Sequence, residues 1–587
     1  MIIFDTKLIV IPVLCDAMNH YFILEQFFTF TETLNGMELI KGNLVDIMQR
    51  KICLATLEID AGRIHKTTIL EDEPVAGEPY IIPGFIDSHV HIESSMLVPA
   101  EFARLAVVHG TVATVSDPHE IANVCGMEGV QYMIDNGRTV PFKFNFGVPS
   151  CVPATDFETA GARLGVQEVT ELLKHPEIRY LSEMMNFPGV LSGYAEVMEK
   201  IKAAHRAGKP VDGHAPGLRG ADAQRYADAI ADHTARLPGT DHECFTEEEA
   251  LDKLNAGMKI LIREGSAARN FEALIGLLKT YPDAIMFCSD DKHPDSLEAG
   301  HINQLCARAV AKGIDVFNVL QAACINPVLH YRLEVGLLKA GDPADLVLVE
   351  DLQQFRPLKT YINGLLVAAD GETFIRTDEA PVINQFECPP AVLADFCVPA
   401  NDRQGVPVIE ALDGQLITNR LFLKPLLEED CFVSDTAQDL LKITVVNRYH
   451  KAAPALAFVK NFGLKRGAMA SSVAHDSHNV IAVGVDDESL CRAVNLVIAE
   501  KGGVAAVDGG QEAIVPLPVA GLMSNADGYQ VAAAYTAIDQ MVKDMGATLS
   551  APFMTLSFMA LLVIPALKLS DKGLFDGQKF EFVASEG

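Results

Sequence analysis

The sequence is poor in positive charge. Its 587 residues include 47 lysines and arginines against 78 aspartates and glutamates, which leaves a formal net charge of −31 at pH 7. A surface of this sign repels the phosphates of nucleic acids and the headgroups of anionic membranes. We therefore expect no nucleic acid and no membrane among the partners of this chain.

Cysteine motifs are missing as well. The twelve cysteines are scattered, and no two of them form a C-x-x-C pair. This pattern predicts reduced thiols in a cytoplasmic protein and disfavours a zinc site built from thiolates. The P-C-x-x-C motif of zinc enzymes of the cytidine-deaminase type is also absent, so a metal in this chain must be held by other residues.

No segment has the pattern of a signal peptide or a membrane span. Residues 8–15 are apolar, but this run is short, contains Pro12 and leads into no A-x-A cleavage site, so we expect no signal peptide. Residues 545–567 carry no charge over a length that would span a bilayer, yet Gly546, Pro552 and Pro565 interrupt them. We expect a buried segment of a globular domain there.

The length of the chain implies about three or four domains. From residue 80 to about residue 330, apolar runs of strand length alternate with amphipathic stretches of helix length. The eight strand candidates are IIPGFIDSHVHI, TVATVSD, FKFNFGV, IRYLSEMM, KPVDGHA, GTDHECF, MKILIREG and AIMFCSD. Eight such units are typical of a (β/α)8 barrel, whereas a doubly wound open sheet would carry a glycine-rich turn after its first strand, and none follows Ile92.

Shorter strands flank the predicted barrel on both sides. We predict that residues 36–80 and 331–380, which are rich in Gly, Pro and Asp turns, pair into one small β domain. Residues 381–587 mix strands and helices and are long enough for a core of their own. The predicted fold is therefore of the α/β class, with a TIM-like (β/α)8 barrel over residues 81–330, a small flanking β domain and a C-terminal α+β domain.

His89 and His91 lie two residues apart at the end of the first predicted strand. Side chains alternate across a strand, so both imidazoles point to the same side, where they can bind one ion together. An H-x-H pair has little specificity on its own. Its position gives it weight, because the catalytic groups of a (β/α)8 barrel lie at the carboxyl ends of its strands.

Four further polar residues end predicted strands in the same way, each after an apolar run: Glu183, His214, His242 and Asp290. A single His or Asp near a strand end is usually a capping or solvated residue, but six on one rim indicate a metal centre. Their donors are nitrogen and oxygen only, which suits Mn, Fe or Zn in an open site. Six donors suffice for two ions bridged by Glu183 and by a hydroxide.

Ordered blocks of sequence carry a resemblance to a known family. The chain resembles the amidohydrolase superfamily, and within it the bacterial adenine deaminases. The resemblance runs from about residue 82 to the C-terminus, in the blocks PGFIDSHVHIESSM, DPHEIANV, SEMMNFPGVLSG, DGHAPGL, DHE, IREGSAARN, CSDD, AHDSHN, LPVAGLMS and VIPALKLSDKGLFDG. Residues 1–35 match no block of that family and form a divergent N-terminal segment.

The resemblance implies a role for each rim residue. The metal ligands would be His89, His91, Glu183, His214, His242 and Asp290. Glu183 would stand where many amidohydrolases carry a carboxylated lysine, and IRYLSEMMNF indeed contains no lysine. Glu183 and Asp290 would be the catalytic residues, with Asp290 as the base that takes the proton of the attacking hydroxide and passes it to the leaving amine.

The resemblance further implies a binuclear Mn²⁺ centre, with Fe²⁺ as a possible replacement and Zn²⁺ less favoured. The implied reaction is the hydrolytic deamination of adenine to hypoxanthine and ammonia. For the assembly we expect a homo-oligomer, with a dimer as the working expectation.

Several residues on or near the rim are candidates for binding adenine. The residue that protonates N1 is left open between His119, Glu120 and Glu264, and donors for the ring nitrogens follow the seventh strand at Arg263, Ser266 and Asn270. Plainer readings exist as well. Glu264 is also placed to pair with Arg263 or Arg269, and Asp117 to cap the turn before Pro118.

The last domain contains a ligand-rich loop of its own. His475, Asp476 and His478 either reach the barrel mouth, hold a separate ion, or form a hydrogen-bonded contact between domains. We favour the hydrogen-bonded contact, because buried polar groups are usually satisfied in this way.

Three other functions compete with deamination of the free base. Cyclic-amide hydrolases such as dihydropyrimidinase and dihydroorotase use the same hydroxide on a carbonyl, but they usually carry the lysine bridge that is missing here. Adenosine deaminases share the barrel, but their HAGE-type block is replaced by DGHAPG, and they use one zinc. A non-catalytic metal-binding protein would carry the rim as a relic, which the intact ligand set argues against.

Overall fold

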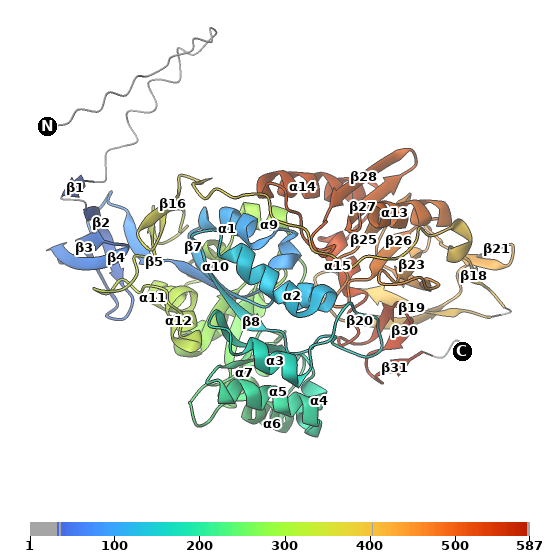
Figure 1. Ribbon diagram of the computed structural model, residues 1–587, viewed down its shortest axis with the longest axis horizontal. Coiled ribbons are helices and arrows are strands. Elements are labelled where there is room, and N and C mark those ends of the chain that lie inside the picture. The colour runs from blue at the N-terminus through green and yellow to red at the C-terminus, as the bar shows by residue number, and fades with distance from the viewer. Residues whose placement is uncertain (1–31, 35–36, 402, 584–587) are drawn as a thin grey trace, which may run out of the picture.

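The computed structural model describes residues 32–34, 37–401 and 403–583. The prediction for residues 8–15 lies outside the described residues, as does the divergent segment 1–35 apart from residues 32–34. From one end of the long axis to the other, the molecule consists of an N-terminal β sheet, a central set of parallel strands with helices around it, and a C-terminal half (Figure 1).

The central strands are parallel and follow one another in chain order. Five form one sheet: β6 (Phe85–Val90), β7 (Thr111–Ser116), β8 (Lys143–Val148), β9 (Ile178–Met184) and β10 (Val211–Gly213). Three form another: β11 (Thr240–Asp241), β12 (Lys259–Arg263) and β13 (Ile285–Cys288). A parallel bridge between Val90 and Asp290 connects the last strand to the first, so the set is curled. The mixed α/β class predicted from the sequence is confirmed.

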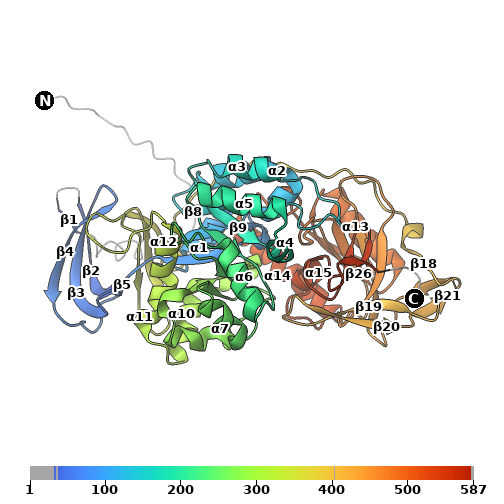
Figure 2. The same cartoon turned by 90° about the horizontal axis from the view of Figure 1, so that it is seen from below.

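Helices surround these strands (Figure 2). They include α1 (Pro99–Val107), α2 (His119–Gly137), α3 (Val166–Leu172), α5 (Ala195–Arg206), α6 (Gly220–Ile230), α7 (Glu247–Asn255), α10 (Ile302–Ala311) and α12 (Asn326–Tyr331). Several present one apolar face to the strands, as the amphipathic pattern predicts. In α10, for example, Ile302, Leu305, Cys306 and Ala309 are buried.

The prediction of one continuous strand over residues 81–92 is wrong. The segment is divided at Gly84 into β5 (Tyr80–Pro83), which pairs with β2 and β14, and β6, which pairs with β7. A Cβ at Gly84 would lie only 2.3 Å from the side chain of Val112, so only glycine fits where the chain passes from one sheet to the other.

Strands from before and after the parallel set form one sheet. Its path is β17 (Glu372–Thr373), β16 (Leu365–Ala369), β15 (Pro357–Ile362), β14 (Leu346–Val349), β5, β2 (Met37–Asp46), β3 (Lys51–Asp60) and β4 (Arg63–Glu71), and β1 (Glu32–Leu34) pairs with β2. Because β5 leads directly into β6, this sheet fixes the point at which the parallel set begins.

The C-terminal half is built on an eight-stranded sheet. Its strands are β19 (Val406–Ala411), β20 (Thr418–Leu423), β23 (Leu440–Val446), β24 (Ala455–Lys460), β25 (Ala468–Ser471), β26 (Val480–Gly484), β27 (Gly503–Asp508) and β28 (Gln511–Pro516). The helices α13 (Asp487–Ala499), α14 (Gly528–Asp544) and α15 (Pro552–Phe558) belong to the same half. Side-chain hydrogen bonds from Asn479 to the Thr159 carbonyl (2.9 Å) and between Tyr535 and His293 (2.6 Å) join it to the parallel set.

Most of the uncharged stretch 545–567 is buried, and the stretch forms the seven-residue helix α15 and a series of turns, as expected for a segment of a globular domain. Among the helices of the described residues, none has both the length and the apolar character needed to cross a membrane.

The prediction of reduced thiols is wrong for two cysteines. Cys397 and Cys431 form a disulfide, with their Cα atoms 5.7 Å apart. The pairing of β18 (Val398–Pro399) with β22 (Cys431–Val433) brings these residues together, and a spacing of 34 residues gave no sign of it in the sequence. The other nine described cysteines are free.

A buried lysine holds the ends of β10 and β11 in place. Lys253 of α7 lies 3.0 Å from Asp241 and 2.9 Å from Glu249, and it donates a hydrogen bond of 2.7 Å to the carbonyl of Ala215. Asp241 in turn accepts hydrogen bonds from the backbone amides of Ala215 and Glu243. The lysine therefore fixes the two chain segments that carry His214 and His242.

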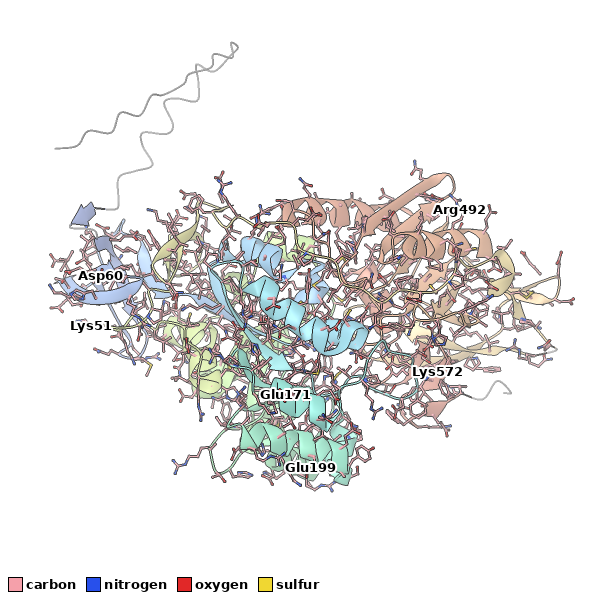
Figure 3. The ribbon with its side chains drawn as sticks, in the orientation of Figure 1. Lys51, Asp60, Glu171, Glu199, Arg492 and Lys572 are labelled. Atoms are coloured by element: carbon pink, nitrogen blue, oxygen red, sulfur yellow. A yellow bond between two sulfur atoms is a disulfide. The ribbon has the colours of Figure 1, made fainter. Side chains whose placement is uncertain are left out.

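We predict that Lys253→Met lowers the free energy of unfolding by about 3–5 kcal/mol, because it leaves two buried carboxylates without their cation. Denaturant unfolding measures this change. Lys202→Met is the matched control, since Lys202 pairs with Glu199 on the exposed face of α5 (Glu199 is labelled in Figure 3), and its loss should cost no more than about 0.5 kcal/mol. Equal effects of the two substitutions would contradict the structural role of Lys253.

Candidate functional site

Six predicted donors lie at the carboxyl ends of the parallel strands. Each is at most 4% exposed, and the set consists of His89 in β6, His91 directly after it, Glu183 near the end of β9, His214 after β10, His242 after β11 and Asp290 after β13. We call these six residues the Glu183 cluster. They converge because parallel strands end at one edge of their sheet.

Glu183 lies between the other members of the cluster. Its Oε1 is 3.4 Å from His91 Nε2, whereas its Oε2 is 2.7 Å from His214 Nδ1 and 3.3 Å from His242 Nε2. The two carboxylate oxygens therefore face different histidines. A carboxylate in this position has the geometry to bridge two metal ions.

Asp290 faces the histidine pair of β6. Its Oδ1 is 3.2 Å from His91 Nε2 and 3.6 Å from His89 Nε2, and the two imidazole nitrogens are 3.2 Å from each other. Two nitrogens that bind the same ion at 2.0–2.1 Å lie about 3 Å apart, so the distance between the two Nε2 atoms fits a shared metal.

The tautomer of His91 supports metal binding. Its Nδ1 lies 3.1 Å from the backbone carbonyl of Asp117, which accepts a hydrogen bond and so fixes the proton on Nδ1. A neutral His91 with its proton on Nδ1 would present an unprotonated Nε2 toward Glu183 and Asp290, the form in which an imidazole binds a metal.

The electrostatics of the cluster keep its carboxylates ionised. Burial alone would raise the pKa of Asp290, but the positive charge of Arg263 and then the hydrogen bond with His91 hold this pKa well below its ordinary value. Burial also opposes ionisation of Glu183, and its charge interaction and hydrogen bond with His214 hold its pKa well below the usual range. Both side chains are thus anions, the form in which a carboxylate can bind a metal ion.

Glu243 is a site residue that the sequence analysis missed. The guanidinium of Arg263 lies 2.5 Å from both Glu243 Oε1 and Asp290 Oδ2, and Glu243 Oε1 is also 3.2 Å from His242 Nε2. Glu243 therefore holds Arg263 against Asp290. Its position in the DHE block, next to His242, was the only sign of it in the sequence.

Only some of the candidates for binding adenine lie close to the Glu183 cluster. His119 comes near the cluster, with its Nδ1 3.7 Å from Glu183 Oε1, and Arg263 contacts Asp290. Glu264 instead forms an ion pair with Arg308 of α10, which is neither of the partners expected for it. The side chain of Ser266 accepts a hydrogen bond from the backbone amide of His293 and contacts Ser296, while the Asn270 side chain bonds the backbone of Arg263 and His242.

The loop between β25 and β26 reaches the parallel set from the C-terminal half. His475 Nδ1 lies 2.5 Å from Glu120 Oε1, and His478 Nε2 forms a short hydrogen bond with Glu120 Oε2. The hydrogen-bonded contact that we favoured for this loop is present. Asp291, which the sequence analysis did not single out, lies nearby and accepts a hydrogen bond of 2.5 Å from Ser94.

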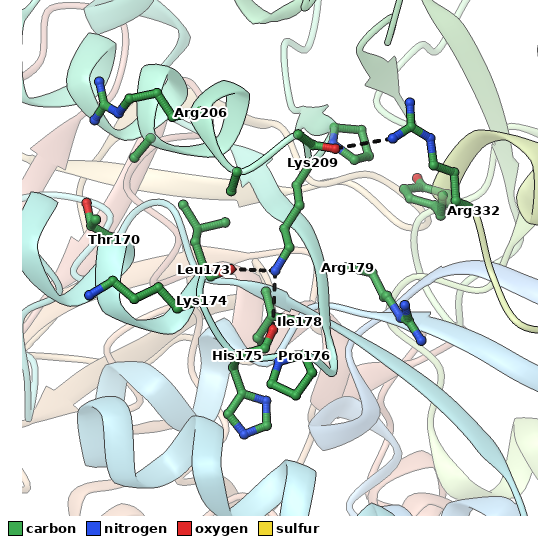
Figure 4. Close-up of a pocket in the computed structure, with 15 residues that line it drawn as sticks. Thr170, Leu173, Lys174, His175, Pro176, Ile178, Arg179, Arg206, Lys209 and Arg332 are labelled. Carbon is green, nitrogen blue, oxygen red and sulfur yellow. Dashed lines mark hydrogen bonds between the residues drawn. The ribbon is translucent and has the colours of Figure 1, made fainter. Parts of the chain in front are cut away.

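A surface pocket of about 590 Å³ lies at the opposite end of the strands (Figure 4). Ile178 and Arg179 at the beginning of β9 line it, together with Lys209 just before β10. Lys209 donates hydrogen bonds to the carbonyls of Leu173 and His175, and burial lowers its pKa to about 8. Glu183 is at the other end of β9, so this basic pocket is separate from the cluster.

Two family models match separate parts of the chain. The Amidohydrolase family model matches residues 80–367, and the Adenine deaminase C-terminal domain model matches residues 415–581. Among solved structures, D-hydantoinase from Thermus sp. is 16% identical with a TM-score of 0.43, over 58% of this chain and 96% of that chain. A similarity of this size adds nothing to the assignment.

Curated relatives match nearly the whole chain. The adenine deaminase of Salinibacter ruber is 54% identical over 93% of this chain and 98% of that protein. The adenine deaminases of Sulfurovum sp. and Methanosarcina barkeri are 53% and 48% identical, each over 93% of this chain and 99% of the relative. The chain therefore belongs to the adenine deaminase family.

Proposed function

We propose that this chain hydrolyses adenine to hypoxanthine and ammonia. One observation carries the proposal: a buried carboxylate, Glu183, lies among four histidines and a second carboxylate, Asp290, in a chain whose relatives are named adenine deaminases. Amidohydrolases are metal-dependent, and the donor set consists of the nitrogen and oxygen atoms that a catalytic divalent cation uses.

The architecture that we propose follows from the strand order. The eight parallel strands close into a (β/α)8 barrel over residues 81–330, because β6 to β13 are consecutive and a bridge connects the last to the first. Residues 36–80 and 331–380 make the small β domain, and residues 381–587 make the C-terminal α+β domain. The site then lies at the barrel end where catalytic groups belong.

We propose a binuclear Mn²⁺ centre, with Fe²⁺ as the alternative metal. His89, His91 and Asp290 would hold one ion, His214 and His242 the other, and Glu183 would bridge them, since its two oxygens face different histidines. When bound, the ions would lower the pKa of the reacting water to about 7 and so supply a nucleophile at neutral pH.

The residues of the chain carry the proton. Asp290, kept ionised by Arg263, takes a proton from the water that attacks C6 of adenine. The C6–O bond forms as the electron pair of the C6=N1 double bond moves to N1. This double bond forms again when Asp290 returns the proton to the amino group and the C6–N bond breaks. Ammonia and hypoxanthine leave, and Asp290 is again an anion. Glu243 acts through Arg263 as a positioning residue.

Adenine lies, in this proposal, against the side of the cluster formed by His119 and Glu120. Both are buried, and His119 is the adenine-binding candidate that comes close to Glu183. We assign Arg263 to positioning because its charge is matched by Glu243 and Asp290. Glu264 and Ser266 are engaged by Arg308, Ser296 and the backbone of His293, so we assign them to the support of the rim loops. The homodimer and the cytoplasmic location stay predictions.

We predict that Glu243→Gln lowers kcat for adenine by about 10- to 100-fold, the usual effect of removing a group that orients a metal ligand. KM should change little, because Glu243 acts on Asp290 and not on the substrate. Steady-state ammonia release by enzyme of equal Mn²⁺ content measures both constants. Glu264→Gln, a neighbouring carboxylate paired with Arg308, is the control and should keep the wild-type kcat. A wild-type kcat for Glu243→Gln would refute the positioning role.

Adenine should be a better substrate than adenosine. If a buried donor binds N9 or N3 of the free base, a ribose on N9 leaves that donor unpaired and costs about 1–3 kcal/mol, or about 5- to 150-fold in kcat/KM. The measurement is ammonia release from adenine, adenosine and dihydrouracil by one Mn²⁺-loaded preparation. Comparable kcat/KM values for adenine and adenosine would favour a nucleoside enzyme, and hydrolysis of dihydrouracil alone would favour a cyclic amidase.

A further inference from the structure

A second group of buried side chains lies beside the Glu183 cluster, and the proposed proton transfers do not use it. It consists of His119 and Glu120 from the first turn of α2 and of His475, Asp476 and His478 from the loop between β25 and β26. All five are at most 4% exposed. The two chain segments belong to different halves of the molecule, so the group forms only when these halves meet.

The role of His478 follows from its tautomer. The backbone amide of Ala474 donates a hydrogen bond of 3.2 Å to His478 Nδ1, which therefore carries no proton. The proton is on Nε2, which donates to Glu120 Oε2. His478 is thus fully satisfied as a neutral imidazole, and it leaves Glu120 Oε1 to face the other members of the group.

Four donor atoms surround one point next to Glu120. Glu120 Oε1 is 2.5 Å from His475 Nδ1 and 3.3 Å from His119 Nε2, and Asp476 Oδ1 is 3.9 Å from each of these nitrogens. Two ligand atoms that bind the same ion at about 2.0–2.2 Å lie at most about 4.4 Å apart, which is twice the longer bond. These four distances are all within that limit.

The group lacks the partners that its burial requires. Glu120 is 1% exposed, and its Oε1, one of the four donor atoms, has no hydrogen-bond partner among the described residues; Asp476 Oδ2 has none there either. No lysine or arginine in the described part of the chain forms an ion pair with Asp476. A buried carboxylate without a cation or a full set of donors is strongly destabilising. A metal ion would supply positive charge at a point where, among the described residues, only the two histidines can otherwise do so.

We propose that His119 Nε2, Glu120 Oε1, His475 Nδ1 and Asp476 Oδ1 bind a third divalent metal ion, separate from the two of the Glu183 cluster. Two imidazoles and two carboxylates suit Mn²⁺, Fe²⁺ or Zn²⁺. Because α2 supplies two ligands and the C-terminal loop supplies two, the ion joins the C-terminal half to the parallel strands. His119 connects the two sites, since its Nδ1 faces Glu183 and its Nε2 faces Asp476.

Counting and locating bound Mn²⁺ tests this site without any assay of activity. The full chain is freed of metal with a chelator, reloaded with Mn²⁺, cleared of excess ion and analysed by inductively coupled plasma mass spectrometry. We expect three ions per wild-type chain and two per chain for Asp476→Asn and His475→Gln. Ser477→Ala, from the same loop, is the control and should keep all three. Anomalous diffraction from crystals of the Mn²⁺-loaded wild type should show the third peak among the four named atoms.

A wild-type chain without an anomalous peak between Glu120 and Asp476 overturns the proposal, and so does retention of the third ion by both variants. If either variant fails to fold, the wild-type map decides alone. A failed adenine assay would leave the metal count and the map unaffected, so this test is separate from that of the proposed function.

Discussion

The site depends on the burial of two carboxylates, Glu183 and Asp290, at the place where the parallel strands end. Buried anions are stable only when positive charge or hydrogen-bond donors surround them. Four histidines and Arg263 do so here, and the strands that carry them are held in register by backbone pairing and by the buried Lys253. The scaffold thus concentrates nitrogen and oxygen donors at one edge, and the metal ions that we propose would lower the cost of burying them.

Much of the site is visible in the sequence because it depends on a simple periodicity. His89, His91, Glu183 and Asp290 each follow a buried apolar run, and parallel strands bring such positions to one edge. The division of the first strand at Gly84 was not visible, since it depends on the close approach of Val112. The disulfide between Cys397 and Cys431 likewise depends on strand pairing.

Contacts between distant segments were the hardest to predict. Glu243 holds Arg263 against Asp290 only because three different strand ends direct their side chains to one point. Glu120 and His478 are 358 residues apart in the sequence, and nothing in either local pattern shows that they meet. The HDSH block was recognisable as ligand-rich, but its partner became clear only from the arrangement of the two halves. That arrangement places the C-terminal half at the mouth of the site.

The central claim is that Glu183 bridges two metal ions, and electron paramagnetic resonance of the Mn²⁺-loaded protein tests it most directly. Two Mn²⁺ ions that share a carboxylate, about 3.5–4 Å apart, give a spin-coupled spectrum that isolated ions do not give. We predict a coupled spectrum for the wild type. In Glu183→Gln, we predict that both the coupled spectrum and ammonia release from adenine are lost. A Glu183→Gln enzyme that keeps both the coupled spectrum and wild-type turnover would contradict the account.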